Sequence, residues 1–341
     1  MKKLLFILYL PLLCLGQEKQ KAEAKVEEGI PLHDKGNYTE AIAKYDEALQ
    51  LDANNFLALN EKALTLSAAN HHEEAIALCQ VAIKAHPEEN ASNLYVTYGN
   101  SLDHLKQVEQ ALAIYNEGIE KYPDFYQLHF NKGITLANAN DLPNAVLSFE
   151  YSAKLNPNHG SSINALGVLN RSNRIAAILA SCRYLILDNQ STRAKANWSS
   201  LTELMSQGVS KKEDQSISIT FTADQLNKEN TPNNFSNTDL ILSMAAALDH
   251  DPKFKNKTDC EKFISKFTTI CHSLEETRKT GNGYFWDYLA PYFIAMEKEK
   301  LIEPFAYYIY YPSKSEDVIS YYQKNSKQIE KLIQWSQRYS W

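Results

Sequence analysis

The sequence is poor in cysteine and lacks any long run of basic residues. Five cysteines occur among 341 residues, and none lies in a CxxC pair or at another zinc-like spacing, so we predict no metal site. The formal net charge of −6 argues against binding to nucleic acid or to an acidic membrane surface. The sequence also lacks a glycine-rich phosphate loop, a nucleophile elbow and an HExxH motif. We therefore predict no cofactor and no catalytic site.

One apolar run stands out, and it lies at the start of the chain. Lys2 and Lys3 precede apolar residues 4–13, and the small residues Cys14 and Gly16 occupy the two specificity positions before a cut. This pattern is typical of a secretory signal peptide, and we predict cleavage after about Gly16 and export to the periplasm or the medium. A membrane anchor would need about 20 apolar residues, so we expect the mature chain not to span a membrane. A lipoprotein signal at Cys14 fits less well, because proline and leucines precede it.

Four cysteines remain after the predicted cleavage. Cys260 and Cys271 lie on one predicted helix, about 16 Å apart along its axis, so they cannot bridge each other within that helix. We predict small buried thiols rather than a disulfide framework at Cys79, Cys182, Cys260 and Cys271. Whether Cys182, Cys260 or Cys271 form any other disulfide stays open.

The first half of the chain repeats with a period of about 34 residues. Four rows cover 22–55, 56–89, 92–125 and 126–159, and a degenerate fifth row begins at Gly160. Each row predicts two antiparallel helices, which need a small residue where they cross. On the first helix that residue is Gly29, Ala63, Gly99, Gly133 or Gly167. The larger residues that recur on the second helices are Tyr45, Cys79, Tyr115 and Phe149.

The motif Gly-Asn-Tyr-Thr-Glu-Ala-Ile at 36–42 forms the turn and second-helix start of the first row. With the recurring small and bulky positions, it resembles the tetratricopeptide repeat family over about residues 22–190. The resemblance implies an all-α superhelix of four clear repeats and a degenerate fifth. Two positions depart from the pattern. Pro31 predicts that the first helix is kinked or begins late, and Leu179 replaces a small residue, which predicts altered packing from Arg174 onward.

The sequence predicts three segments. These are a signal peptide at 1–16, a repeat solenoid at 17–208 closed by a capping helix from about 192, and a C-terminal domain of unknown type at 209–341. The C-terminal domain is mostly helical and rich in aromatic residues, and we recognise no family for it. Its predicted elements are a strand at 216–221 and helices at 239–248, 259–279, 286–300 and 316–338.

The resemblance also implies where a ligand would bind. In this family the first helices line a concave groove, and contacts come from the second, fifth, ninth, twelfth and thirteenth places of each row. The candidates selected from these places are Asn60, Asn100, Asp103, His104, Gln127, Phe130, Asn138, Asn164 and Arg171. Amides can pair with a peptide backbone and Phe130 can seat an apolar side chain, although a solvated surface is an equal alternative. The lysines with which some members hold a C-terminal carboxylate are missing.

The leading hypothesis is therefore a non-enzymatic scaffold that binds a protein or peptide in a bacterial cell envelope. The alternative is a glycan-binding protein, in which the turn at 281–283 would present Tyr284, Trp286 and Tyr288 at the surface. Packing of these rings in the core is the competing interpretation. A less favoured hypothesis is an enzyme with its site in the C-terminal half, where the sequence offers only isolated carboxylates. The sequence identifies neither the partner nor the oligomeric state.

Overall fold

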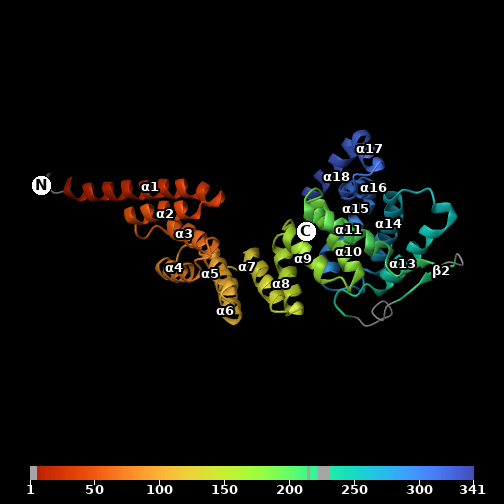
Figure 1. The fold of residues 1–341 in the computed structure, drawn as a ribbon, viewed down its shortest axis with the longest axis horizontal. Helices are drawn as coiled ribbons and strands as arrows, with labels where there is room; N and C mark the ends of the chain where they lie inside the picture. Colours follow the sequence, from red (N-terminus) through yellow and green to blue (C-terminus); the bar gives the residue numbers. More distant parts are fainter. Residues whose placement is uncertain (1–5, 213–215, 222–230) are drawn as a thin grey trace. The chain divides into compact units, whose positions relative to one another are not determined.

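A computed structural model describes residues 6–212, 216–221 and 231–341, with side chains described from residue 17 onward. Residues 1–5 of the predicted signal peptide, and the side chains of 6–16, lie outside this description. The described chain is mostly helical and has only two short strands, which confirms the predicted all-α class (Figure 1). Within the described ranges, no helix combines the length and the apolar character that a membrane crossing requires.

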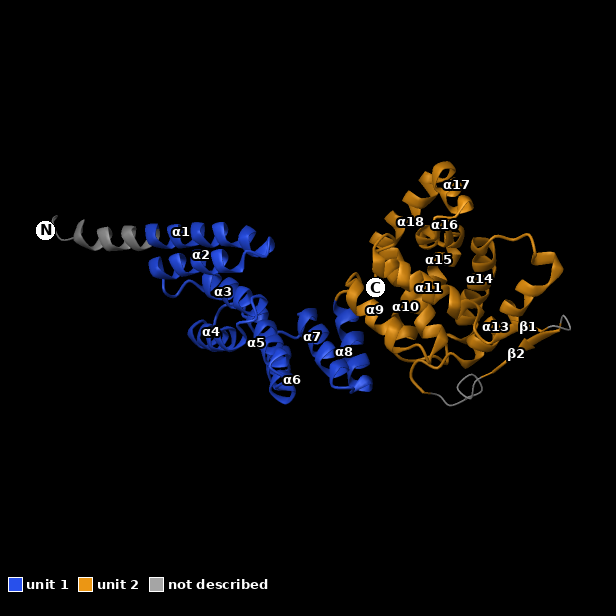
Figure 2. Ribbon diagram, in the orientation of Figure 1, with its two compact units in different colours: residues 1–155 blue, residues 156–341 orange. Residues whose placement is uncertain are grey.

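The chain divides into two compact units, residues 1–155 and residues 156–341 (Figure 2). The division falls near the end of the fourth predicted row, after the last residue of its second helix. The sequence-based boundary at 208 marks a different limit, the expected end of the solenoid, and the extent of the array beyond the fourth row stays a prediction.

The first unit contains one helix pair for each of the four predicted rows. Helix α1 continues through Pro31, so the alternative of a late helix start is wrong. The first helices of the pairs are α1 (Phe6–Asp34), α3 (Phe56–Ala68), α5 (Ser92–His104) and α7 (Tyr126–Asn138). The second helices are α2 (Tyr38–Leu51), α4 (His72–Ala85), α6 (Val108–Lys121) and α8 (Leu142–Leu155).

The turn within each pair holds one residue in the left-handed conformation. These residues have φ values between 62° and 78° and are Gly36, Asn70, Lys106 and Asn140. A left-handed residue after a helix satisfies the last carbonyl groups and reverses the chain, and glycine and asparagine adopt it most easily. The same conformation at the same place shows that each row folds as one structural unit.

The two helices of each pair cross where a small residue meets a bulky one sixteen positions later. A β-carbon added to Gly133 would lie 2.8 Å from Cε1 of Phe149, and one added to Gly29 would come within 3.0 Å of the Tyr45 ring. In the second row Ala63 meets the smaller Cys79, and both are fully buried. A smaller side chain on one helix is matched by a larger one on the other, so the distance between the two helices stays similar from row to row.

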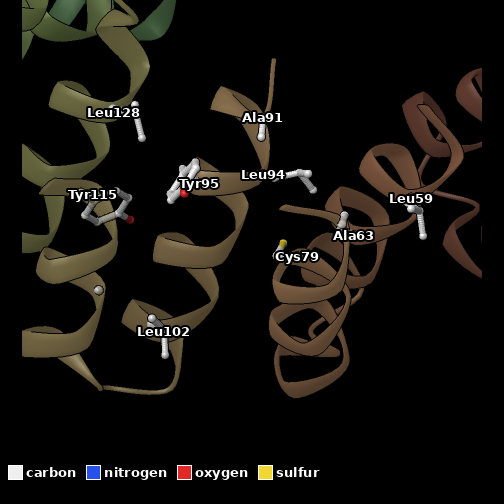
Figure 3. Close-up of a cluster of buried hydrophobic side chains, with 11 residues drawn as sticks. Leu59, Ala63, Cys79, Ala91, Leu94, Tyr95, Leu102, Tyr115 and Leu128 are labelled. Atoms are coloured by element: carbon white, nitrogen blue, oxygen red, sulfur yellow. The ribbon is translucent and has the colours of Figure 1, made fainter. Parts of the chain in front are cut away.

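The pairs are joined by a continuous apolar core. Its central cluster runs from Leu59 on α3, through Leu94 and Tyr95 on α5, to Leu128 on α7 (Figure 3). A second cluster, around Val26, joins α1, α2 and α3. Each helix pair therefore buries its apolar surface against its neighbours, as expected for a repeat array.

The second unit begins with α9 (Gly160–Leu169), α10 (Arg174–Leu187) and α11 (Thr192–Ser206). A hairpin of β1 (Val209–Lys211) and β2 (Ile217–Ile219) follows, with Val209 opposite Ile219. The remaining elements are α13 (Ser236–Ala247), η1 (Leu248–His250), η2 (Pro252–Phe254), α14 (Asp259–Thr277), a π-helical segment η3 (Phe285–Leu289), α15 (Ala290–Lys298), α16 (Ile302–Ile309), η4 (Tyr311–Ser313), α17 (Glu316–Lys324) and α18 (Ser326–Arg338).

The predicted helices of this unit are mostly present, with three corrections. The helix expected at 316–338 is interrupted at Asn325, and the one expected at 286–300 starts as the π-helical segment before Pro291. Helix α16 was not predicted. Pro304 and a run of aromatic residues obscure its period, although it lies in the core through Phe305 and Ile309.

Helix α10 is the centre of the second unit. Every residue from Arg174 to Ile186 is buried, because α9, α11, α13, α16 and η3 all contact this helix. A helix surrounded on all sides needs no polar face, which explains why Leu179 stands where a repeat would carry a small residue.

Candidate functional site

The first helices of the N-terminal unit pack against one another in sequence order. Helix α1 contacts α3, α3 contacts α5 and α5 contacts α7, whereas the second helices show no comparable mutual contacts in the described ranges. Ser101 Oγ donates to Ser67 Oγ at 3.0 Å, which links α5 to α3. We call one side of this layer the first-helix face. It carries the residues at the second, fifth, ninth, twelfth and thirteenth positions of each of the four rows.

Helix α3 contributes two exposed leucines to the first-helix face. Leu57 and Leu64 are 43% and 41% exposed, and they lie seven residues apart, so they share one side of the helix. The predicted candidate Asn60 lies between them and donates from Nδ2 to Glu61 Oε1 at 3.0 Å. Its carbonyl oxygen and the two leucines together offer a polar contact flanked by apolar ones.

Helix α5 contributes the candidates Asn100, Asp103 and His104. Asn100 Oδ1 accepts a hydrogen bond from the Tyr115 hydroxyl at 2.7 Å, which fixes the amide. Burial raises the pKa of Tyr115, and the charge of Asp103 adds to this, so the carboxylate lies near that hydroxyl. The exposed ring of His104 stacks on His72 of α4, with centroids 4.7 Å apart.

Helix α7 contributes Gln127, Phe130 and Asn138. Phe130 is half-buried, and its ring lies 5.7 Å from that of Phe149, so part of it remains available for contact. Gln127 Oε1 has no hydrogen-bond partner in the part of the chain that the structure describes. Asn138 is exposed, and Ile134, on the same side of the helix, is 37% exposed.

The candidate Asn164 lies on α9 and the candidate Arg171 lies in the turn after it, both in the second unit. Asn164 Oδ1 accepts from Asn197 Nδ2 of α11 at 2.7 Å, and Arg171 pairs with Glu203 at 2.9 Å. Asn164 therefore links α9 to α11, and Arg171 links the turn after α9 to the same helix. The structure brings the other seven candidates onto three contacting helices and assigns these two to a separate unit.

The predicted exposed aromatic surface in the C-terminal half is wrong for two of its three rings. Tyr284 and Trp286 are buried, at 3% and 4% exposure, and Tyr288 is half-buried. Trp286 stacks on Phe235 with centroids 4.4 Å apart, and its Nε1 donates to the Asn234 carbonyl at 3.1 Å. Core packing, the competing interpretation, therefore describes Tyr284 and Trp286.

Glycine explains why the turn at 281–283 does not present these rings. A β-carbon on Gly281 would come within 3.0 Å of three atoms of the Trp286 ring, so the ring packs down onto the turn. Gly283 has φ +98°, and a β-carbon there would lie 2.6 Å from Asn233 Oδ1.

No group of three or more metal-ligating side chains occurs among the residues that the structure describes. The four described cysteines are buried free thiols, as the sequence indicated. Burial raises the pKa of Cys79 to about 12, which disfavours the thiolate that metal binding or nucleophilic attack requires.

Comparison with known protein families identifies the N-terminal half. Residues 32–69 match a family model described as TPR repeat, and residues 99–159 match one described as tetratricopeptide repeat. The N-terminal half is built of tetratricopeptide repeats. No family model matches the C-terminal half.

Individual relatives share the tetratricopeptide region over short lengths. A STIP1 homologue of Dictyostelium discoideum is 26% identical over 160 residues, which are 38% of this chain and 28% of the relative. A small glutamine-rich tetratricopeptide repeat-containing protein of the same organism is 31% identical over 109 residues, 32% of each chain. The chain thus spans about a third or less of these relatives. The tetratricopeptide protein TTC0263 of Thermus thermophilus aligns with 53% of this chain and 98% of its own, at 18% identity and a TM-score of 0.46.

The tetratricopeptide array exposes apolar residues that the sequence-based selection omitted. Leu57, Leu64 and Ile134 occupy the second or ninth places of their rows, so the same scan of places contained them. Leucine and isoleucine on a helix are usually core residues, so their presence at these places is a weak signal of a binding surface. Their positions along the helix could have indicated exposure. The side of α3 that faces the core is already filled by Leu59, Ala63 and Leu66, so Leu57 and Leu64 lie outside it.

Proposed function

We propose that this protein is a non-enzymatic interaction scaffold whose tetratricopeptide array holds an extended segment of a protein partner along the first-helix face. The observation that supports this most directly is the exposure of Leu57, Leu64 and Ile134 beside the amide groups of Asn60 and Asn100. Apolar side chains gain free energy when a ligand covers them, and fixed amides pair with a peptide backbone and set its register.

The fixed geometry of this face favours binding. Asn100 is held by Tyr115 and Ser67 by Ser101, so neither side chain has to be ordered when a ligand arrives. Less conformational entropy is then lost on binding, which leaves more of the contact energy as affinity. An extended segment presents both backbone amides and alternating side chains, which matches a surface of mixed amides and leucines.

We further propose that the scaffold works in the cell envelope of a bacterium after export, with residues 1–16 removed. The support is the charged start, the short apolar run and the small residues before Gln17. The intact mass of the protein purified from its native host tests this. A chain that begins at or near Gln17 is expected, and a chain that keeps its first sixteen residues would contradict cleavage.

The binding proposal is tested with a phage-displayed library of random 12-residue peptides selected on the full chain. Peptides recovered in this way should bind at least about tenfold more weakly to the double variant Leu57→Gln/Leu64→Gln, because two apolar contacts are lost. The matched control is Val81→Gln/Leu147→Gln, on α4 and α8, where the side chains are 59% and 51% exposed. Equal binding to both double variants, or no enriched peptide, would contradict the proposal.

A further inference from the structure

The two units carry very different charge. Residues 17–155 contain 21 acidic and 11 basic side chains, a formal charge of −10. Residues 156–341 contain 20 acidic and 22 basic side chains, a formal charge of +2. The acidic character of the chain therefore resides in the tetratricopeptide array, where the ligand is proposed to bind.

Three lysines of the first helices bind groups on the second helices of their neighbourhood, away from the first-helix face. Lys62 of α3 pairs with Asp46 of α2 at 2.6 Å, and Lys132 of α7 donates to Asn116 of α6 at 2.7 Å. Lys25 of α1 pairs with Glu47 of α2 at 3.0 Å. These three lysines bind groups on second helices, so their charge is not offered to a ligand on the face.

Acidic side chains occupy the face itself. Among the row positions that define the face, three are acidic, namely Glu23, Asp34 and Asp103, and none is lysine or arginine. None of these three carboxylates has a salt-bridge partner in the described ranges of the chain. Glu61 lies beside Asn60, and Lys35 and Lys106 lie in the turns between helices rather than on the helices.

The charges of the carboxylates also act on buried tyrosines of α2 and α6. Burial raises the pKa of Tyr45, and the charges of Glu61 and Asp34 add to this effect. Asp103 acts in the same direction on Tyr115, whose hydroxyl holds Asn100. Negative charge therefore lies beside the Asn60 amide, through Glu61, and acts on the tyrosine that holds the Asn100 amide, through Asp103.

Resting on the function proposed above, we propose that the segment bound by the first-helix face is cationic, with lysine or arginine side chains interspersed among apolar ones. Its apolar side chains cover Leu57, Leu64 and Ile134, and its basic side chains lie near Asp34, Glu61 and Asp103. An acidic segment or a free C-terminal carboxylate is disfavoured, because the face offers it no cation. The net charge of the array also attracts a basic segment over a distance of about 10 Å or more at low salt, which speeds association.

Three synthetic 12-residue peptides, each labelled with fluorescein, test this inference on the full chain. All carry leucine at the same alternate positions, and the intervening positions are lysine, serine or glutamate. At low salt the lysine peptide should bind about tenfold more tightly than the serine peptide, since several weak ion pairs act together. The glutamate peptide should bind more weakly than both. Raising the salt concentration to about 0.5 M should remove most of the difference, because exposed charges are screened.

Two triple variants with the same change in net charge locate the effect. Asp34→Asn/Glu61→Gln/Asp103→Asn neutralises two acids of the face and Glu61 beside Asn60. Glu40→Gln/Glu73→Gln/Glu109→Gln neutralises three exposed acids at the starts of α2, α4 and α6. The face variant should reduce the preference for lysine over serine to about twofold or less, and the control should keep most of it. Equal loss in both variants would overturn the inference, because net charge alone would then explain the preference.

The serine peptide separates this inference from the proposed function. If the serine and lysine peptides bind equally, and both lose affinity in Leu57→Gln/Leu64→Gln, the array binds peptides and the cationic inference is overturned. If none of the three peptides binds, the proposed function and the inference are both overturned. Tighter binding of the glutamate peptide would also overturn the inference.

Discussion

The ring of Tyr115 lies against Gly99 so closely that a β-carbon at position 99 would come within 3.0 Å of three ring atoms. The same relationship joins Gly29 to Tyr45, and Phe149 takes the place of tyrosine in the fourth row. In each case the bulky ring fills the space that a missing side chain leaves. The crossing of the two helices therefore depends on both residues together.

We expect Gly99→Ala to lower the free energy of unfolding by about 1–3 kcal/mol, because the added methyl group must displace a buried ring. In a Tyr115→Cys background the same change should cost much less, since the second row already pairs Ala63 with Cys79. Urea denaturation of the two single variants and the double variant measures this coupling. Additive costs would contradict the proposed steric relationship.

The fifth row replaces the bulky ring with Arg183, which is fully buried. Its Nη2 donates to the Pro157 carbonyl at 3.1 Å and to Asn158 Oδ1 at 2.6 Å, and its guanidinium lies 4.6 Å from the Trp341 ring. Arg183→Ala should lower the free energy of unfolding by about 2–4 kcal/mol, through lost hydrogen bonds and packing.

The control for this prediction is Arg193→Ala, at an exposed position of the neighbouring helix α11. It should change stability by no more than about 0.5 kcal/mol, as is usual for surface substitutions. Thermal unfolding of both variants compares them. A similar effect of the two substitutions would show that burial of Arg183 contributes little.

The four buried cysteines should be unreactive in the folded protein. Burial raises the pKa of Cys182, Cys260 and Cys271 as well as that of Cys79, so the reactive thiolate is scarce and the sulfur atoms are inaccessible. In a Cys14→Ser variant, a thiol-specific chromogenic disulfide should label four thiols only after urea is added. Rapid labelling in buffer alone would contradict the described burial.

The stability of the array should decrease as the pH falls below about 6.5. Burial lowers the pKa of His129, with Lys132 adding to this and a backbone hydrogen bond to Pro123 opposing it. The unfolded chain therefore takes up a proton at a higher pH than the folded chain, so acid favours unfolding, and the contribution is fully present above the ordinary histidine pKa. His129→Gln should reduce the slope of unfolding free energy against pH between 7 and 5; an unchanged slope would contradict this assignment.

The repeat half could be predicted from the sequence because its determinants are local and recur. The glycine and tyrosine of each pair, the left-handed turn residue and the apolar spacing are visible within one row of about 34 residues. The arrangement of the C-terminal unit depends on contacts that are distant in sequence. Trp286 packs on Phe235 and bonds to Asn234, about fifty residues away, and nothing near Trp286 indicates that partner.

The candidate site was predicted only in part for a similar reason. The register of the rows placed Asn60, Asn100 and Phe130 on one set of helices, and the structure joins those helices. The pairing of Arg171 with Glu203 joins the turn after α9 to the later helix α11, and the row pattern carries no information on that contact. Leu64 is likewise exposed because other residues of α3 already fill the side of the helix that faces the core.

The most direct test of the peptide-binding face is site-specific photocrosslinking. A photoreactive amino acid replaces Leu64 on α3 in one variant and Val81 on α4 in another, and each is irradiated with a peptide selected from the random library. We predict that the peptide becomes attached at position 64 and not at position 81. Attachment at position 81 with none at position 64 would contradict the claim that the first-helix face holds the ligand.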